Sequence, residues 1–315
     1  MMIFRERHDL WSIVLAAGDG TRLNPLTLAL YGEELPKQFA HIESNRSLLQ
    51  ATVERALNWS APERIVVVVA SEREELARRQ LSAYGPVRII VQPRNLGTGP
   101  GILLPLSHVM ALDPDAMVVL LPSDHYVRDE GPFRAAVQNA RARAEASGSV
   151  VLVGALPEAP DPQYGWIVPR TSRSGEVYVD CFEEKPNAAV AKRLLAKGAL
   201  WNTFVLLASA AHLWQLGHEY LPEQAQCLDP CRQGRSVDDR EFIRSIYEHL
   251  PPADFSRDVL AKASGLEVVP LPECGWSDWG TPERVFASLR GTAEFEQLAR
   301  RLPNKQQRLA WAATN

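Results

Sequence analysis

The feature of this sequence that most constrains its fold is the alternation of short apolar runs with amphipathic stretches through its first half. Each apolar run is continuous and rich in β-branched residues, as expected for parallel strands covered on both faces. The predicted strands are Trp11–Ala16, Arg64–Ala70, Val87–Val91, Ala116–Leu121 and Val150–Gly154, and the predicted helices are Leu48–Trp59, Glu72–Tyr84, Gly99–Leu112 and Gly131–Ser147. This order predicts an α/β fold with a doubly wound, mostly parallel, Rossmann-like sheet, whose ligand site lies beyond the carboxyl ends of the strands.

The second half of the chain has a more mixed pattern. Two strands, Gly165–Pro169 and Val177–Lys185, predict a small antiparallel patch. The remaining predicted elements are the helix Ala188–Lys197, the strand Trp201–Ala208, the helices Ser209–Leu221 and Asp238–Leu250, and the strand Glu267–Pro272. No internal repeat or low-complexity linker divides the chain, so we expect one domain over residues 1–290.

The chain after Pro282 is predicted to be helical and charged, and residues 291–315 are predicted to form a helical C-terminal tail. The spacing of its apolar residues indicates an amphipathic helix. Such a helix packs either on its own domain or on a second copy of the chain. The sequence favours the first arrangement and leaves a homo-oligomer open.

Composition excludes several classes of function. Hydrophobic residues make up 46% of the 315 residues, which is enough for a sizeable core. The net charge of −4 argues against a nucleic-acid-binding protein, which usually has a basic excess. No apolar run approaches the roughly 20 residues of a membrane span. The four cysteines form no C-x-x-C pair and no secretory signal pattern opens the chain, so we expect unpaired thiols and a cytoplasmic protein.

The turn after the first strand, Leu15–Leu23 (Leu-Ala-Ala-Gly-Asp-Gly-Thr-Arg-Leu), is suited to binding phosphate. Gly18 and Gly20 let the backbone approach an anion closely. Arg22 adds a planar guanidinium that can hold two phosphate oxygens. Lys37, in the nearby segment Pro-Lys-Gln-Phe, can reach the same phosphates. A tight turn with an exposed arginine is the structural alternative.

Two further segments follow predicted strands. In Gln92–Gly101, small residues would let a flat base lie against the backbone, with hydrogen bonds from Gln92, Asn95 or Thr98; the alternative is a loop that caps a helix at Thr98. Asp124, in Leu-Pro-Ser-Asp-His, stands at a strand's carboxyl end, where a carboxylate can hold Mg²⁺. Its alternative role is a turn cap.

In order and identity, these motifs resemble the sugar-1-phosphate nucleotidyltransferase family over roughly residues 12–290. A Gly-x-Gly-Thr-Arg-Leu loop followed by Pro-Lys is the opening signature of that family. Pro-Lys-Gln-Phe, Arg94-Asn95 and Ser-Asp-His are similar to members that are mannose-1-phosphate guanylyltransferases (GDP-mannose pyrophosphorylases). The departures from the usual pattern are Ala17, Asp19, Asn24 and Phe204. Asp19 beside a triphosphate has no assigned role.

The resemblance implies the site residues. The nucleotide would be bound by Ala16, Ala17, Gly18, Gly20, Thr21, Arg22, Lys37, Gln92, Asn95, Thr98 and Ser123. The sugar phosphate would be bound by Tyr164, Gly165, Glu184, Lys185 and Asn202, and Mg²⁺ by Asp124 and Asp278. The catalytic set would be Arg22, Lys37, Asp124, Lys185 and Asp278. The pairing of the two aspartates rests on the resemblance alone, because spacing does not bring them together.

The resemblance also implies the reaction, in which a sugar 1-phosphate oxygen attacks the α-phosphorus of a nucleoside triphosphate and pyrophosphate leaves. GTP and mannose 1-phosphate, giving GDP-mannose, are the favoured substrates. The alternatives are a uridylyl- or thymidylyltransferase acting on glucose 1-phosphate, and a non-catalytic, nucleotide-sugar-binding regulatory subunit of the same fold. A dinucleotide-dependent dehydrogenase is disfavoured, because the loop lacks the third glycine of that motif.

Overall fold

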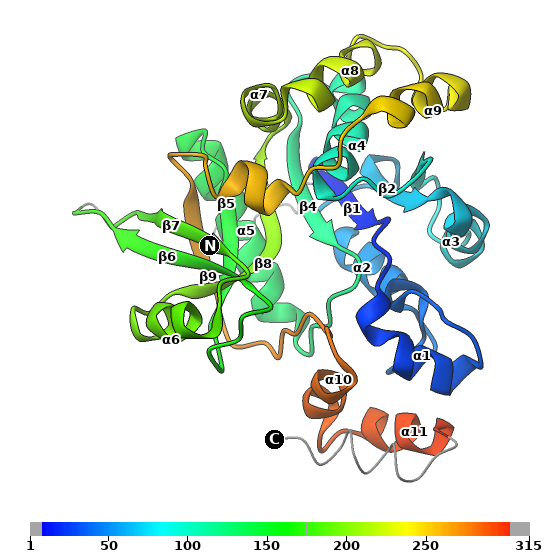
Figure 1. The fold of residues 1–315 in the computed structure, drawn as a ribbon, viewed down its shortest axis with the longest axis vertical. Coiled ribbons are helices and arrows are strands. Elements are labelled where there is room, and N and C mark those ends of the chain that lie inside the picture. The colour runs from blue at the N-terminus through cyan, green and yellow to red at the C-terminus, as the bar shows by residue number, and fades with distance from the viewer. Residues whose placement is uncertain (1–7, 174, 303–315) are drawn as a thin grey trace, which may run out of the picture.

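Nine strands form one continuous sheet in the computed structural model, which describes residues 8–173 and 175–302 (Figure 1). The strand order is β3-β2-β1-β4-β8-β5-β9-β7-β6, and β6 also pairs with β8. The strands are β1 (Trp11–Ala16), β2 (Ile65–Ala70), β3 (Arg88–Gln92), β4 (Met117–Pro122), β5 (Val151–Ala155), β6 (Gly165–Thr171), β7 (Val177–Glu184), β8 (Leu200–Ser209) and β9 (Glu267–Leu271).

Helices cover both faces of the sheet. They are α1 (Asn24–Tyr31), α2 (Leu48–Ala56), α3 (Glu74–Leu81), α4 (Thr98–Leu112), α5 (Glu130–Ser147), α6 (Ala188–Ala196), α7 (Ala210–Tyr220), α8 (Pro222–Arg232), α9 (Arg240–His249), α10 (Pro282–Leu289) and α11 (Ala293–Arg301). The N-terminal predictions agree with β1 to β5 and α2 to α5, with bounds that differ by a few residues.

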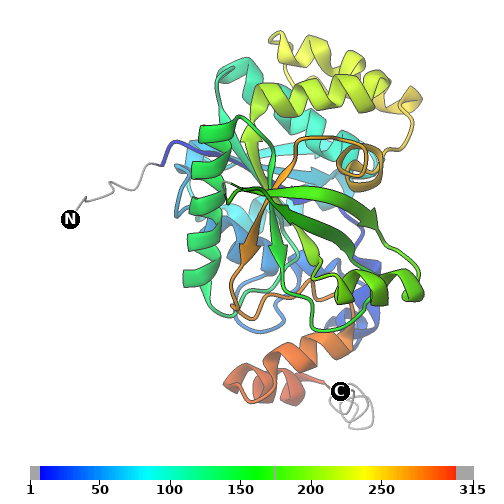
Figure 2. The same ribbon diagram turned by 90° about the vertical axis from the view of Figure 1, so that its left-hand side faces the viewer.

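Successive residues of β1 belong to two different cores. Ile13 packs with residues of α4, α7, α8 and α9, which lie together at the top of Figure 1. Val14 packs with residues of α2, α3 and α5 on the opposite face, where α5 runs along the sheet in Figure 2. Because neighbouring side chains of a strand point to opposite faces, a strand that is buried on both sides must be apolar throughout. This explains the unbroken apolar runs.

The prediction of a mostly parallel sheet requires correction, because the sheet is mixed. Parallel pairing joins β3-β2-β1-β4 and the pair β5-β9. Strand β8 lies antiparallel between β4 and β5, and β6 pairs antiparallel with β7 and with β8. The contact of β6 with β8 closes β8-β5-β9-β7-β6 into a small barrel. The apolar sequence of β8 reports burial on both faces and does not report direction, so sequence alone missed this arrangement.

The predicted antiparallel patch is present as the hairpin of β6 and β7, and it forms one wall of the barrel. Helices α1 and α8 were not predicted; α8 contains Pro230, which obscures its pattern. The region after Pro282 forms two helices, α10 and α11, separated by a turn at Gly291 with φ +78°. The part of the predicted tail beyond Leu302 lies outside the described residues.

A third, smaller core joins the two ends of the chain. It contains Leu23 and Leu26 from the N-terminal region together with Phe286 of α10 and Leu298 of α11. Leu298 is completely buried, so the described part of the tail packs on its own chain. Among the described residues no helix has the length and apolar character needed to cross a membrane. The four cysteines are unpaired, as predicted.

Candidate active site

The loop between β1 and α1 is held against the 3₁₀ turn η2 (Lys37–Phe39). Gly20 has a φ of +61°, and a Cβ atom there would lie 3.0 Å from a backbone nitrogen of η2. The side-chain amide of Gln38 donates hydrogen bonds to the carbonyl oxygens of Ala16 (3.1 Å) and Gly18 (2.7 Å). Glycine at position 20 therefore supplies both the left-handed backbone and the space for this contact.

A cavity of about 280 Å³ lies along this loop, and we call it the loop cavity. The predicted nucleotide-binding residues that line it are Ala16, Ala17, Gly18 and Thr21. Asp19 lines it too, and its Oδ2 accepts a hydrogen bond of 3.2 Å from the side-chain amide of Asn95. Asp19 thus ties the loop to the segment that follows β3, which gives this unassigned residue a structural role.

Lys37 lies between the two aspartates predicted to bind metal. Its side chain is buried, and its Nζ lies 3.0 Å from Oδ2 of Asp124, which follows β4. The same ammonium donates to the main-chain carbonyl of Asp278. Residues that are 154 positions apart in sequence therefore share one cation (278 − 124). Lys37, Asp124 and Asp278 form a single cluster.

The carboxylate of Asp278 is held in a fixed orientation. Its Oδ1 accepts hydrogen bonds from the hydroxyl of Tyr164 (2.8 Å), from Arg284 Nη1 (2.7 Å) and from the backbone N–H of Gly280 (3.0 Å). Its Oδ2 lies 3.3 Å from Nη2 of Arg22. Arg284 also pairs with Asp161 and stacks over the ring of Tyr164 at 4.6 Å. Oδ1 is saturated, whereas Oδ2 has a single partner within the described part of the chain.

Both aspartates are ionised, and the neighbouring histidine is neutral. Burial is the largest influence on Asp124 and Asp278 and would raise the pKa of each, but the charge of Lys37 and the other nearby charges and hydrogen bonds together lower both pKa values. Arg284 lowers the pKa of Asp278 further. Burial lowers the pKa of His125 to about 4, although Asp124 opposes the shift. His125 Nδ1 is buried without a hydrogen-bond partner among the described residues.

Arg22 reaches this cluster from the loop. Its side chain is 50% exposed, and its Nη1 donates to the side-chain oxygen of Gln163 at 2.9 Å. These contacts are weak for a half-exposed group, so the guanidinium is available to an incoming anion. Four of the five predicted catalytic residues, Arg22, Lys37, Asp124 and Asp278, therefore meet at one place.

In the predicted base-binding segment, Gln92–Gly101, only one of the three predicted hydrogen-bonding residues contacts the β1–α1 loop. Asn95 is exposed and contacts Asp19. Gln92 is buried, and its amide donates to the hydroxyl of Tyr247 at 3.0 Å. The hydroxyl of Thr98 accepts a hydrogen bond of 2.7 Å from the backbone of Phe255. The polar groups of Gln92 and Thr98 are thus already engaged within the protein.

The small residues of this segment also have a packing role. Gly97 has a φ of +88°, and a Cβ atom there would lie 2.5 Å from the carbonyl oxygen of Ala253. A Cβ atom on Gly99 would lie 2.9 Å from the side chain of Ala253. Ser123, another predicted nucleotide ligand, is buried and donates its hydroxyl to the carbonyl of Leu15. Its visible role is to join the ends of β4 and β1.

The predicted sugar-side residues form a second group on the barrel. A Cβ atom on Gly165 would lie 2.7 Å from a carboxylate oxygen of Glu184 and 3.3 Å from Cβ of Asn202, so this glycine permits their approach. Lys185 lies 3.0 Å from Glu184, is 60% exposed and has a φ of +46°. No contact joins Lys185 to Asp124 or Asp278 among the described residues. Tyr164 belongs to both groups, because its hydroxyl reaches Asp278.

The departure at Phe204 has a local explanation. This residue has a φ of +57°, a conformation that glycine adopts freely and that costs other residues energy. The side-chain oxygen of Asn202 accepts a hydrogen bond of 3.0 Å from the Phe204 backbone. The register of β8 with β5 shifts at the same point. Strand β8 therefore has an irregular backbone at Phe204 that fixes the side chain of Asn202. Phenylalanine adopts this conformation here, at a position where glycine is frequent in the family that the sequence resembles.

Asp124 and Asp278 are the residues of this cluster that would hold a divalent metal ion, with the rest of its ligands from substrate and water. The described residues contain no group of three or more His, Cys, Asp or Glu side chains suited to a metal. Asp124 and Asp278 nevertheless provide two ionised carboxylates, and the ammonium of Lys37 already lies against both residues as a cation. Mg²⁺ commonly binds through one or two carboxylates, substrate phosphates and water. The donor set is complete only with a phosphate present.

Sequence reasoning missed the residues that support this cluster, namely Arg284, Asp161 and Gln163. Arg284 stands in the first turn of α10, after a Gly-Thr-Pro segment that marks only a helix start. Asp161 and Gln163 lie in the connection between β5 and β6. Nothing in the spacing of these residues marks them as partners of Asp278 and Arg22. Their role follows only from the way α10 and the barrel meet.

The comparisons with known proteins identify the family to which this fold and cluster belong. The chain belongs to the nucleotidyl transferase family, whose model, described as "Nucleotidyl transferase", matches residues 11–294. It is 34% identical over 278 residues to the xanthan biosynthesis protein XanB of Xanthomonas campestris pv. campestris (strain B100), covering 87% of this chain and 58% of that protein. It is 32% identical over 300 residues to the mannose-1-phosphate guanylyltransferase of Escherichia coli K12. This match covers 90% of this chain and 61% of that protein.

A solved structure agrees with the assignment to this family. It is described as mannose-1-phosphate geranyltransferase from Thermus thermophilus, with a TM-score of 0.78, 27% sequence identity, and coverage of 90% of this chain and 79% of that chain. The chain spans about three fifths of the length of the two curated relatives above.

Proposed function

We propose that this chain transfers a nucleotidyl group from a nucleoside triphosphate to a sugar 1-phosphate, with GTP and mannose 1-phosphate as substrates and GDP-mannose and pyrophosphate as products. The observation that carries the proposal is the convergence of Arg22, Lys37, Asp124 and Asp278 into one cluster. The relatives named for guanylyl transfer to mannose 1-phosphate support the choice of substrates. The catalytic domain is proposed to span residues 1–290, with 291–315 as an appended tail.

In the proposed reaction, an oxygen of the sugar 1-phosphate attacks the α-phosphorus of the nucleotide. A new P–O bond forms, and the bond between the α-phosphorus and the oxygen bridging to the β-phosphorus breaks, so that the electron pair leaves with pyrophosphate. A phosphate monoester has a second pKa of about 6 and is mostly dianionic at neutral pH. The nucleophile therefore needs no general base.

The work of the protein is to position anions and to neutralise charge. Arg22 would hold the leaving phosphates, because its half-exposed guanidinium has only weak partners among the described residues. Lys37 would move from the aspartates to the transferring phosphoryl group. Lys185, with Glu184, would hold the sugar phosphate. Mg²⁺ held by Asp124 and Asp278 would supply charge neutralisation at the phosphates.

A pyrophosphate-release assay tests this function. The chain is supplied with each of four nucleoside triphosphates and with several sugar 1-phosphates, with and without Mg²⁺. We expect release that requires Mg²⁺ and is fastest with GTP and mannose 1-phosphate. Faster release with UTP or dTTP and glucose 1-phosphate would replace the proposed substrates. No release with any pair would favour a non-catalytic, nucleotide-sugar-binding subunit.

The variant Asp278→Ala tests the site assignment. Turnover should be abolished while the fold remains intact, because the variant loses a metal-binding carboxylate. Circular dichroism and a thermal unfolding transition establish that the variant is folded. Turnover like that of the wild type, at saturating Mg²⁺ and both substrates, would contradict the assignment.

A further inference from the structure

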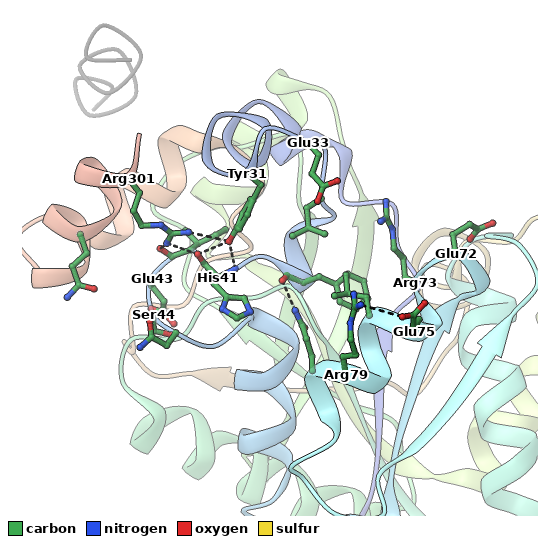
Figure 3. Close-up of a pocket in the computed structure, with 17 residues that line it drawn as sticks. Tyr31, Glu33, His41, Glu43, Ser44, Glu72, Arg73, Glu75, Arg79 and Arg301 are labelled. Carbon is green, nitrogen blue, oxygen red and sulfur yellow. Dashed lines mark hydrogen bonds and ion pairs between the residues drawn. The ribbon is translucent and has the colours of Figure 1, made fainter. Parts of the chain in front are cut away.

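A second and larger cavity lies outside the catalytic cluster. Its volume is about 620 Å³, and it is bounded by α1, the loop of residues 41–45, α3 and α11 (Figure 3). We call it the α3 cavity. Sites for small molecules commonly have volumes of about 300–1,000 Å³. The α3 cavity shares no residue with the catalytic cluster or with the pair Glu184 and Lys185.

One wall of the α3 cavity carries hydrogen-bonding groups, two of which have shifted pKa values. Burial and the charge of Arg301 lower the pKa of His41, so its imidazole is neutral. Burial raises the pKa of Glu43 to about 7, and this carboxyl group has no hydrogen bond or ion pair with the other described residues. Arg301 fixes the wall by donating to the carbonyl of His41 and to the hydroxyl of Tyr31. Ser44 and Asn45 add a hydroxyl and an amide.

The opposite wall carries two arginines, Arg73 before α3 and Arg79 within it (Figure 3). Arg73 has no hydrogen bond or ion pair within the described part of the chain. Arg79 pairs with Glu75 at 3.3 Å, and both side chains are strongly exposed, so this pair contributes little stability. Glu33 and Glu72 also line the cavity, but they are exposed and their charges are screened by solvent.

These two walls suit one class of ligand. We propose that the α3 cavity is a second binding site for a sugar monophosphate, with the phosphate on Arg73 and Arg79 and the sugar hydroxyls on the wall of residues 41–45. Hydrogen-bond donors and acceptors on one wall suit hydroxyl groups, and guanidinium groups on the other suit phosphate oxygens. Apolar side chains between the walls suit the C–H surface of a pyranose; they are Leu35, Phe39, Ile42 and Leu76.

Arg73 couples this site to the loop cavity, because its side chain lines both cavities. One guanidinium cannot serve a phosphate in each cavity equally well. The wall of the α3 cavity also continues directly from η2, the turn that carries Lys37. A sugar monophosphate in the α3 cavity should therefore compete with the triphosphate and raise its KM. This step rests on the proposed function, whereas the binding itself does not.

Calorimetric titration of the full chain with a hexose 6-phosphate tests the binding. The phosphate at C6 cannot act as the 1-phosphate nucleophile, so no turnover disturbs the measurement. Inorganic phosphate and the unphosphorylated hexose provide the two comparison titrations. We expect one equivalent of hexose 6-phosphate to bind saturably. Its affinity should be at least tenfold higher than that of inorganic phosphate or of the unphosphorylated hexose. Equal affinity for inorganic phosphate, or no saturable binding, would overturn the proposal.

Matched variants locate the bound molecule. Arg73→Ala should weaken binding at least tenfold, and Glu43→Ala should weaken it several-fold. Arg78→Ala is the control, because Arg78 lies on α3 outside this cavity and pairs with Glu74. Unchanged affinity in Arg73→Ala would overturn the site. Loss of binding in Lys185→Ala would place the ligand at the catalytic sugar site and would overturn it equally.

Kinetics test the coupling separately. Hexose 6-phosphate should raise the KM for GTP several-fold with little change in kcat, and Arg73→Ala should abolish this effect. An unchanged KM at saturating hexose 6-phosphate would refute the competition for Arg73. If the chain shows no nucleotidyl transfer at all, the proposed function fails, and the calorimetric result alone decides the second site.

Discussion

Asp278 is the residue on which most polar contacts of the site converge. Its Oδ1 accepts three hydrogen bonds, from Tyr164, Arg284 and the Gly280 backbone, whereas Oδ2 faces Arg22. This asymmetry fixes the rotation of the carboxylate and leaves Oδ2 with Arg22 as its partner. Arg284 therefore acts as a positioning residue, because it touches the carboxylate and no substrate phosphate needs to reach it.

The variant Arg284→Met tests this role at the residue scale. Loss of the guanidinium removes the charged one of the three hydrogen bonds to Oδ1 and leaves those from Tyr164 and Gly280, so the orientation of Asp278 is fixed less tightly. Substitutions that remove a group orienting a metal ligand typically cost about 10–100-fold in metal affinity or activity. We expect a reduction of that order in Mg²⁺ affinity, measured by calorimetric titration in the presence of nucleotide. Arg284→Lys, which retains the charge, should recover part of it. Equal Mg²⁺ affinity in wild type and Arg284→Met would refute the positioning role.

Lys185 lies apart from Asp124 and Asp278, so we expect its substitution to affect only one of the two substrates. It forms an ion pair with Glu184, and its ammonium is largely exposed. Lys185→Ala should raise the KM for the sugar 1-phosphate by at least tenfold and leave nucleotide binding nearly unchanged. Initial rates at varied concentrations of each substrate measure both effects. Equal losses for the two substrates would rule out the role given to Lys185.

At the scale of elements, the fit of the β1–α1 loop against η2 decides where Lys37 lies. Burial of the Lys37 side chain depends on this contact, because Gln38 of the same turn holds the loop through two carbonyl oxygens. The left-handed backbone of Gly20 makes the close approach possible. A change in the loop is therefore also a change in the position of the lysine.

Three glycine substitutions separate backbone strain from crowding. Gly20→Ala meets both a left-handed φ and a backbone nitrogen at 3.0 Å, Gly32→Ala meets only the left-handed φ of +75°, and Gly18→Ala meets neither. The expected losses in unfolding free energy are about 2 kcal/mol or more for Gly20→Ala, about 1 kcal/mol for Gly32→Ala and close to zero for Gly18→Ala. Urea denaturation measures all three. A loss for Gly18→Ala as large as that for Gly20→Ala would contradict the assigned contact.

At the scale of the whole molecule, the third core joins elements that are remote in sequence. Residues of α10 and α11 pack against Leu23 and Leu26, which lie at the end of the β1–α1 loop and in α1. Arg284 and Asp278 lie beside this core, in α10 and in the segment before it. The packing of the C-terminal helices therefore supports the cluster of Lys37, Asp124 and Asp278.

The variant Leu298→Ala measures this support. Leu298 is fully buried on α11, and truncation of a buried leucine typically costs about 2–5 kcal/mol. We expect a loss in that range for the unfolding free energy of the whole chain. Leu112→Ala is the matched control, because Leu112 is 62% exposed and should cost less than about 0.5 kcal/mol. A loss no larger than that of the control would show that α11 is not part of the cooperative fold.

The sequence by itself determined the elements of the N-terminal half, except α1, and the chemical types of the candidate site residues. Val14 and its neighbours are apolar on successive positions because both faces of β1 are covered, and this signal is local. Gly20, Arg22 and Lys37 were identifiable as candidates because residue types that suit a phosphate stand close together along the chain there.

Only the tertiary structure decided the direction of β8, the closure of the barrel and the partners of Asp278. Strand direction depends on the path of the whole chain, and an apolar strand such as β8 has the same composition in either direction. Arg284 reaches both Asp278 and Asp161 only after α10 has packed against the third core. Contacts between residues that are distant in sequence leave no periodic or spacing signal, so the support of the site became visible only in the folded molecule.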